Sequence, residues 1–145
     1  MTVTVAIDLP VDLDTAWQEI ETIEDHVYWM ADAERLEFAT EQRRGVGTEI
    51  VVATRVGPFR TSDRMLFTEW VDHVRLSVEH KGLFTGQGSF SLDGIDDSTT
   101  RLTWEEEIRF PWYLGGRLGA ALAQPVLRWI WARNLRRLSS RLSSR

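Results

Sequence analysis

The fold is decided by one stretch near the end of the chain, residues 114–145, with the sequence LGGRLGAALAQPVLRWIWARNLRRLSSRLSSR. Its apolar side chains recur every three or four residues, the spacing that places them on one face of an α-helix. This period predicts one long helix. Its inward face is expected to consist of Leu114, Leu118, Leu122, Val126, Trp129 or Ile130, Leu135, Leu138 and Leu142. Pro125 lies inside the stretch and predicts a kink or a break, because proline has no amide hydrogen and clashes with the preceding turn.

Charge separates this region from the rest of the chain. Residues 108–145 contain eight arginines and no Asp or Glu, whereas residues 1–107 contain 9 Lys+Arg and 22 Asp+Glu. The net charge of −5 therefore divides into about −13 and +8. An acidic body argues against non-specific nucleic-acid binding, so no nucleic-acid partner is expected.

The basic face of the predicted helix is formed by Arg133, Arg136, Arg137, Arg141 and Arg145. We expect this face to be solvated and to pair with the acidic surface of the body. Weak contact with a membrane surface is the alternative, because a basic helix is attracted to anionic lipid.

Length and composition indicate a single domain over residues 1–145, large enough to bury a substantial core. No run approaches the roughly 18 to 20 apolar residues of a membrane span. The N-terminal sequence MTVTVAIDLPVD lacks the features of a signal peptide. The chain has no cysteine, which excludes disulfides and thiolate metal sites and favours a cytoplasmic location. The oligomeric state is not predicted.

Ahead of the helix, apolar and polar residues alternate in short runs typical of strands. The first strand ends at Pro10, Asp12 is expected to cap a short helix through Ile20, and a second short helix is expected over residues 24–30. Further strands are expected near residues 36–38, 50–54, 59–71, 74–80, 84–92 and 102–108, with a hairpin turn at DGIDDS, residues 93–98. Short turns between successive strands predict an antiparallel meander, and only the long helix can cover it.

This order of elements resembles the START/polyketide-cyclase superfamily, also called SRPBCC, to which the pollen-allergen fold belongs. The matching segments are VDLDTAWQEIETIEDHVYWM (11–30), RRGVGTEI (43–50), RMLFTEWVDHVRLSVE (64–79) and WARNLRRLSSRL (131–142). The resemblance implies an α+β helix-grip fold. In this fold an antiparallel, curved sheet of six to seven strands wraps around the C-terminal helix, and two short helices follow the first strand. It also implies a deep apolar cavity, because members bind or transform lipids, sterols, polyketides and other bulky apolar molecules. The family has no universal catalytic residue, so none is carried over.

Two titratable residues are predicted to face that cavity. In TRLTWEEEIRF (100–110) the alternation places Glu106 on the same face as Trp104 and Ile108. His80 shares its face with Val78 on an earlier strand. A carboxylate in an apolar cavity is suited to acid/base work, and a neighbouring His could shuttle its proton. In the alternative interpretation Glu106 is solvated at the cavity mouth or paired with an Arg, and His80 is structural.

Aromatic and apolar residues supply the predicted ligand contacts. The residues expected to bind the ligand are Tyr28, Trp29, Phe67, Phe90, Trp104, Leu118 and Leu122. Tyr28, Trp29 and His26 belong to the second short helix, which lies near the pocket entrance in the resembling family. They could stack on a planar ligand, or serve only as core residues.

Two further features leave alternatives open. Asp63 either faces inward or pairs at the surface with Arg60 or Arg64. The glycines at 115, 116 and 119 weaken the start of the helix. They indicate either a mobile flap over the pocket or close packing against a neighbouring element.

Other kinds of site are not supported. The three histidines follow no metal-ligand spacing, so no metal site is expected. No helix is predicted after Gly86-Gln87-Gly88, so this segment lacks the context of a phosphate loop, and no G-x-S-x-G elbow occurs. No cofactor is predicted.

These observations predict a carrier or binding protein for a hydrophobic or aromatic small molecule, lipid- or polyketide-like, held in an internal cavity. The alternative is a polyketide cyclase/dehydrase-type enzyme in which Glu106 or His80 moves protons. A third hypothesis is a partner-binding module that uses the basic helix. A cavity well below the ~300 Å³ typical of ligand pockets would favour that third hypothesis.

Overall fold

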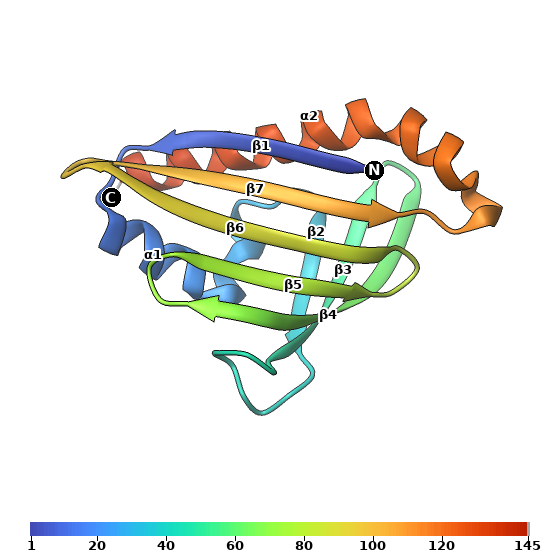
Figure 1. The fold of residues 1–145 in the computed structure, drawn as a ribbon, viewed down its shortest axis with the longest axis horizontal. Helices are drawn as coiled ribbons and strands as arrows, with labels where there is room; N and C mark the ends of the chain where they lie inside the picture. Colours follow the sequence, from blue (N-terminus) through green and yellow to red (C-terminus); the bar gives the residue numbers. More distant parts are fainter. Residues whose placement is uncertain (145) are drawn as a thin grey trace.

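A computed structural model describes residues 1–144; Arg145, the last residue of the predicted basic face, lies outside them. In chain order the elements are β1 (Thr2–Leu9), α1 (Leu13–Glu21), the 3-10 helix η1 (Ile23–Tyr28), β2 (Ala33–Phe38), β3 (Glu49–Val56), β4 (Phe59–Val71), β5 (Arg75–Lys81), β6 (Thr85–Asp96), β7 (Thr99–Arg109), the 3-10 helix η2 (Trp112–Leu114) and α2 (Gly116–Ser143). Over the described residues, seven strands form one sheet in the order β1-β7-β6-β5-β4-β3-β2 (Figure 1).

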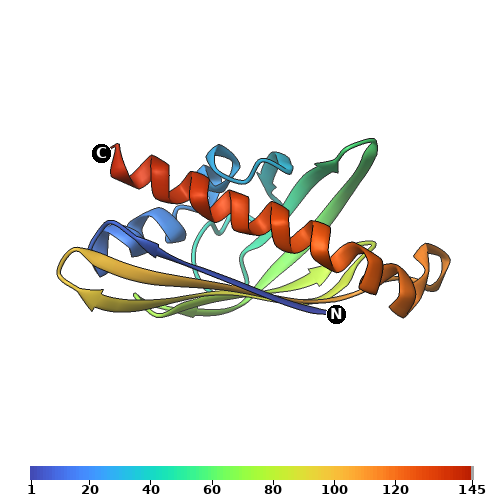
Figure 2. The ribbon, with the colours of Figure 1, turned by 90° about the horizontal axis from the view of Figure 1, so that it is seen from above.

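Every neighbouring pair in the sheet is antiparallel. β2 to β7 follow one another as a meander, and β1 pairs with β7 at the far edge. The sheet curves around α2, which crosses its concave side (Figure 2). The predicted α+β helix-grip fold is confirmed, with seven strands and with two short helices after the first strand.

The short helix α1 begins where the sequence predicted. The side chain of Asp12 accepts a hydrogen bond from the Thr15 amide at 3.1 Å, which satisfies one of the free N–H groups at the helix start. Trp17 and Ile20 are buried on its inner face. This helix and η1 close one end of the curved sheet.

The C-terminal half of α2 forms much of the core at that end. Trp131, Leu135, Leu138 and Leu142 are all buried, at spacings of four, three and four residues. Asn134 lies among them and anchors the helix to the β2 region. Its amide nitrogen donates to Asp32 at 2.6 Å, and its amide oxygen accepts from the Ala31 N–H at 3.0 Å. The predicted inward positions in this half are therefore confirmed.

The N-terminal half of α2 corrects the prediction. The side chains of Leu118 and Leu122 are 70% and 72% exposed. Of the two alternatives Trp129 and Ile130, Trp129 is 57% exposed and Ile130 packs against the core. The residues of this half that instead face the sheet are Ala120, Ala123 and Leu127. This half of the helix carries two apolar stripes, and periodicity alone does not say which of them packs inward.

Pro125 does not break the helix, which runs without interruption from Gly116 to Ser143. The predicted break is wrong because one proline removes one backbone donor, and the turns on either side keep their own bonds. The glycines before it have a structural role. Gly115 and Gly116 adopt positive φ values of 90° and 51°, and a Cβ on Gly119 would lie 2.0 Å from the Leu114 carbonyl oxygen. These positions support close packing as the reason for the glycines.

The last hairpin is tighter than predicted. β6 continues to Asp96 and β7 begins at Thr99, so the reversal takes only residues 97–98. The predicted turn at 93–98 is therefore corrected: its first four residues extend the strand, with a register shift between Gly94 and Asp96.

Candidate functional site

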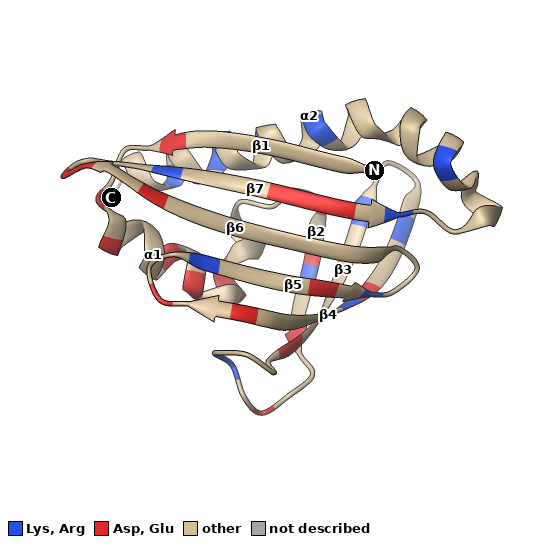
Figure 3. Cartoon of the chain, viewed as in Figure 1, with Lys and Arg blue, Asp and Glu red and all other residues tan. Residues whose placement is uncertain are grey.

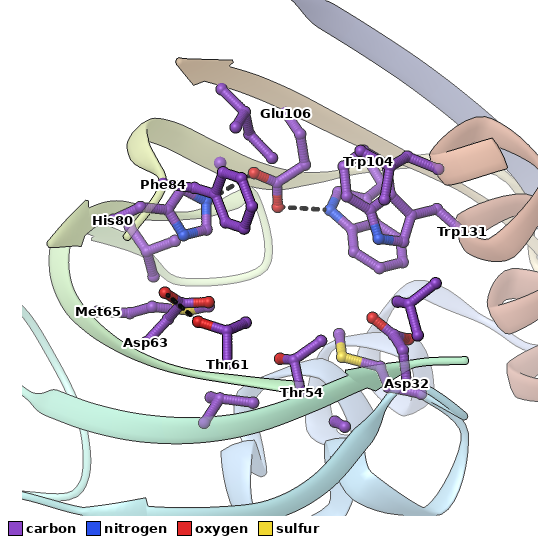
Figure 4. A pocket seen from close by; sticks show the side chains of 18 of the residues that line it. Asp32, Thr54, Thr61, Asp63, Met65, His80, Phe84, Trp104, Glu106 and Trp131 are labelled. Carbon is purple, nitrogen blue, oxygen red and sulfur yellow. Dashed lines mark hydrogen bonds and ion pairs between the residues drawn. The ribbon is translucent and has the colours of Figure 1, made fainter. Parts of the chain in front are cut away.

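A cavity of about 490 Å³ lies between the concave face of the sheet and the N-terminal half of α2. Its walls are mostly aliphatic and aromatic, and they include Leu36, Val52, Phe67, Leu76, Phe90 and Leu127. A volume of this size falls within the range of small-molecule sites and exceeds the ~300 Å³ below which the partner-binding hypothesis would be favoured. Polar side chains are few, and three of them meet in one corner (Figure 4).

That corner contains Glu106, His80 and Asp63, which come from β7, β5 and β4. The His80 Nε2–H donates to Glu106 Oε2 at 2.7 Å. The Trp104 indole N–H donates to the other carboxylate oxygen at 2.9 Å. The side chains of His80 and Glu106 are only 10% and 9% exposed, so this ion pair lies almost wholly out of water.

The contact between Glu106 and His80 spans an intervening strand, and a glycine makes it possible. Gly88 of β6 is paired with Glu106 on one side and with Val78 on the other. A Cβ at Gly88 would lie 2.5 Å from both carboxylate oxygens of Glu106. The carboxylate therefore folds over the backbone of Gly88 to reach β5, in space that any side chain would fill.

Asp63 is accommodated in the same way. Its side chain is buried, and a Cβ at Gly82 would lie 2.1 Å from its Oδ1. The Leu83 amide hydrogen-bonds to its carboxylate, and the Thr61 hydroxyl donates to Oδ1 at 3.5 Å. Of the two alternatives for Asp63, the structure shows the inward one.

The electrostatics of the corner favour a charged imidazole. Burial by itself lowers the pKa of His80. The hydrogen bond to Glu106 and the negative charges of Glu106 and Asp63 outweigh burial, so the pKa is raised above its usual range. Burial raises the pKa of Asp63, opposed by the charge of His80 and by its hydrogen bonds. His80 thus holds its proton more tightly than a histidine in water does.

His26 also lines the cavity, but its contacts fit the structural interpretation. Its Nε2–H donates to the Ile20 carbonyl oxygen at 2.8 Å, which ties η1 to the end of α1. Burial lowers the pKa of His26, so its neutral form is favoured. Its ring packs against Trp29 and Phe90 at centroid distances of 5.2 and 5.7 Å.

The predicted ligand contacts divide into two groups. Phe67, Phe90 and Trp104 line the cavity. Four others lie elsewhere, and these are corrections: Tyr28, Trp29, Leu118 and Leu122. Trp29 is fully buried behind Phe90 and Trp104, at centroid distances of 5.9 and 6.2 Å, because η1 turns it into the core. Tyr28 is 61% exposed and lies under the guanidinium of Arg141 at 4.9 Å.

Several lining residues were not singled out from the sequence. Trp131 enters from α2 with its ring 5.4 Å from that of Trp104. Asp32 lines the opposite side of the cavity and is held by Asn134. Gly88 belongs to the Gly86-Gln87-Gly88 segment, whose sequence pattern excludes a phosphate loop but does not by itself indicate a role in the cavity. The sequence signal for its role was a glycine on the strand next to the one that carries Glu106, whose carboxylate was predicted to face inward.

The described part of the chain has neither a cluster of metal ligands nor a membrane-spanning helix. Among residues 1–144, no three His, Asp or Glu side chains are grouped so that they could hold a metal ion. No helix in that range is both long and apolar enough to cross a membrane.

Solved structures share this fold over nearly the whole chain. Protein TTHA0849 from Thermus thermophilus matches with a TM-score of 0.79 and 18% identity, over 99% of this chain and 98% of its own. A START superfamily protein from Mycobacterium smegmatis matches with a TM-score of 0.76 and 13% identity, over 99% and 97% of the two chains.

The Zhui aromatase/cyclase from Streptomyces sp. R1128 matches with a TM-score of 0.68 and 13% identity, over 97% of this chain and 89% of its own. No model of a protein family matches the chain, and no curated protein does. The chain therefore shares its fold with a START superfamily protein and an aromatase/cyclase, as the resemblance of the sequence implied.

Proposed function

We propose that this protein binds a mainly apolar, aromatic small molecule with at least one polar group, and holds it inside the cavity. The observation that carries the proposal is the cavity itself: about 490 Å³, walled by aliphatic and aromatic side chains. Its only ion pair among described residues joins His80 to Glu106 in one corner. An apolar ring system supplies the hydrophobic gain, and the polar corner sets its orientation.

The ligand's polar group is expected to face Glu106 and His80. A wholly apolar ligand would leave this charged pair in contact with hydrocarbon, which costs free energy. A hydroxyl or carbonyl group can hydrogen-bond to the pair instead. The favoured class is therefore lipid- or polyketide-like molecules with a phenol, enol or ketone at one end.

The test uses 1-naphthol as a probe, with binding measured by calorimetry. Ala123 lines the cavity from α2, whereas Ala121 is exposed two residues earlier on the same helix. Ala123→Phe fills the cavity and should weaken 1-naphthol binding by at least about tenfold, roughly the free energy of burying a few methylene groups. Ala121→Phe is the matched control and should leave binding unchanged. Equal affinity in both variants would contradict binding in the cavity.

Native mass spectrometry of the freshly purified protein addresses the natural ligand. A retained mass that disappears in Ala123→Phe, and remains in Ala121→Phe, supports an occupied cavity. A mass that both variants retain would place that molecule outside the cavity.

A second candidate is an enzyme that removes a proton next to a carbonyl group, as a cyclisation or dehydration of the polyketide type requires. The observation that favours it is the 2.7 Å contact between Glu106 and an imidazole whose pKa is raised. One of the proteins of similar fold is named as an aromatase/cyclase, which is in keeping with this candidate.

The step balances within the pair. The Glu106 carboxylate takes the proton from carbon, and the His80 imidazolium gives its proton to the developing enolate oxygen. This leaves a neutral carboxylic acid and a neutral imidazole. Transfer of the proton between them, along their hydrogen bond, restores the starting charges. The net change is conversion of a ketone into its enol.

Exchange of the acidic hydrogens of 2-tetralone in heavy water, followed by NMR, tests this candidate. Glu106→Gln should abolish the protein's acceleration, because an amide cannot accept the proton, while 1-naphthol still binds. Glu105→Gln is the matched control, since Glu105 is the exposed neighbour on the same strand. Acceleration that survives in Glu106→Gln, or none in the unaltered protein, would leave binding as the function.

A further inference from the structure

The outer face of α2 in its N-terminal half is apolar and open to solvent. Leu118 and Leu122 are 70% and 72% exposed, and Trp129 is 57% exposed. Spacings of four and seven residues place these three on one side of the helix. In Figure 2 the helix lies across the front of the molecule, and the exposure of the three side chains shows that the other described residues leave this side largely uncovered. Large apolar side chains grouped on one surface indicate an interaction site.

The segment just before the helix adds two exposed aromatic residues. Trp112 and Tyr113 of η2 are 85% and 59% exposed, and their rings meet edge to face at 5.6 Å. Tryptophan and tyrosine are enriched where proteins meet the polar boundary of a lipid bilayer, because each ring has an apolar body and a polar group.

Toward its C-terminus the same side of the helix becomes basic. Four arginines surround an open hollow on the surface together with Tyr28 and Ser140: Arg133, Arg136, Arg137 and Arg141. The guanidinium of Arg133 lies over the Trp129 ring at 5.4 Å, so the apolar and basic parts are continuous. Figure 3 shows only basic residues among the charged residues of α2, while the acidic residues lie on the strands, the short helices after β1 and the loops.

This surface adjoins the opening of the cavity. Val126 lines the cavity and is also 51% exposed, and it lies one turn from both Leu122 and Trp129. Phe59, at the tip of the β3–β4 hairpin, likewise lines the cavity and is 41% exposed. A molecule leaving the cavity past Val126 therefore meets the apolar side of α2 first.

We propose that the outer face of α2, together with η2, docks on the surface of an anionic lipid bilayer and exchanges the ligand with it. The proposal rests on the proposed function, since it names the membrane as the source or destination of an apolar ligand. Leucines and tryptophans enter the boundary of the bilayer, and Arg133, Arg136 and Arg137 contact anionic headgroups. Arg141 is already paired with Glu19 and Asp25 of the same molecule. A second copy of the chain is a poorer occupant, because the same face of that copy offers no acidic side chain to these arginines.

The experiment is co-sedimentation with vesicles of phosphatidylcholine that contain about 30% phosphatidylglycerol. The protein should bind them. Binding should fall at least about tenfold with pure phosphatidylcholine, and also at about 0.5 M salt, where charge attraction is screened. No binding to the anionic vesicles would overturn the proposal.

Three sets of substitutions locate the surface. Changing Leu118, Leu122 and Trp129 together to Gln should reduce vesicle binding at least about tenfold, through lost apolar burial. Changing Arg133, Arg136 and Arg137 together to Gln should reduce it by a similar factor. The control changes Arg35, Arg43 and Arg44 to Gln, which removes the same charge from the other side of the molecule. An equal loss in the control would mean general charge attraction and overturn the proposal.

Calorimetry with 1-naphthol separates this proposal from the cavity function. The three variants should bind 1-naphthol normally, because none of the changed residues lines the cavity. They should keep their melting transitions, because all of the changed side chains are exposed. Vesicle binding without 1-naphthol binding would contradict the cavity function and leave the docking intact. Sedimentation equilibrium that shows a dimer, lost in the Leu118, Leu122 and Trp129 variant, would assign the face to a second copy and overturn docking.

Discussion

The two halves of α2 rest on different parts of the same sheet. The C-terminal half packs Leu135, Leu138 and Leu142 into a filled core, whereas the N-terminal half covers a cavity of about 490 Å³. Each side chain buried in the filled core stabilises the folded state through its packing contacts, whereas the empty space of the cavity provides no such contacts. The difference indicates that stability is concentrated at one end of the molecule and ligand chemistry at the other.

Removing the chain after Gln124, which includes the whole C-terminal half of α2, should have the largest effect. A chain that ends at Gln124 loses Trp131, Leu135, Leu138 and Leu142, all buried. It should show no cooperative unfolding transition in calorimetry, because the concave face then has no cover. A chain that ends at Ser143 is the control. A sharp melting transition in the shorter chain would show that the filled end does not hold the fold together.

A matched pair of single substitutions sharpens the comparison. Leu138→Ala removes a fully buried side chain and should lower the free energy of unfolding by about 2 to 5 kcal/mol. Leu122→Ala makes the same chemical change at a side chain that is 72% exposed, and its effect should stay within about 0.5 kcal/mol. Urea denaturation measures both. Similar losses would mean that the two halves contribute alike.

A single methyl group added beside the cavity should change both the stability of the protein and the pKa of His80. Gly88→Ala places a Cβ where the Glu106 carboxylate now lies, so the carboxylate must move away from His80. The cost should be about 1 to 3 kcal/mol, as for other overpacked sites, and the pKa of His80 should fall. NMR titration of the imidazole and urea denaturation measure the two effects.

Gly94→Ala is the control on the same strand, since a Cβ there would meet Leu13 only at 3.8 Å. An unchanged pKa of His80 in Gly88→Ala would mean that the carboxylate does not depend on the space over Gly88.

The smallest expected effect is a change in how stability depends on pH. The folded-state pKa of His80 is raised, so its contribution is fully present below the unfolded value of about 6.5 and is lost as pH rises through the folded pKa. Glu106→Gln removes the main partner that raises this pKa, so stability should fall less steeply above pH ~6.5.

Denaturation at several pH values compares the two proteins, each with His73→Gln. That second substitution is needed because Asp14 and Asp72 also raise the pKa of His73. An identical pH dependence in both proteins would contradict the charge coupling between Glu106 and His80.

Strict alternation made part of the site predictable. In β7 every second residue from Leu102 to Ile108 is buried, so the period of two placed Glu106 inward correctly. In β4 the register shifts between Phe67 and Glu69, which breaks the alternation. Phe67 lines the cavity, and the ring of Trp70, three residues later, packs against the Phe67 ring at a centroid distance of 5.1 Å. Because the alternation is broken in this strand, the sequence did not indicate which face of β4 carries Asp63.

Contacts between distant strands were beyond the sequence pattern. His80 and Glu106 lie on strands separated by β6, and their meeting depends on the empty space over Gly88. In α2 the exposed and covered stripes are both apolar, so the pattern predicted the helix and its buried second half but not which side of the first half faces the cavity. That choice follows from the tertiary packing.

Because the Trp104 indole donates a hydrogen bond to Glu106, the spectroscopic signal of this tryptophan should depend on what occupies the cavity. Trp104 and Trp131 both line the cavity with ring centroids 5.4 Å apart, close enough for their electronic transitions to couple in near-ultraviolet circular dichroism. Removing one partner through Trp131→Phe isolates the coupled signal from the other five of the seven tryptophans. Any molecule that enters between the rings, or takes the indole's place at the carboxylate, changes that signal, so candidate ligands can be screened without labelling them.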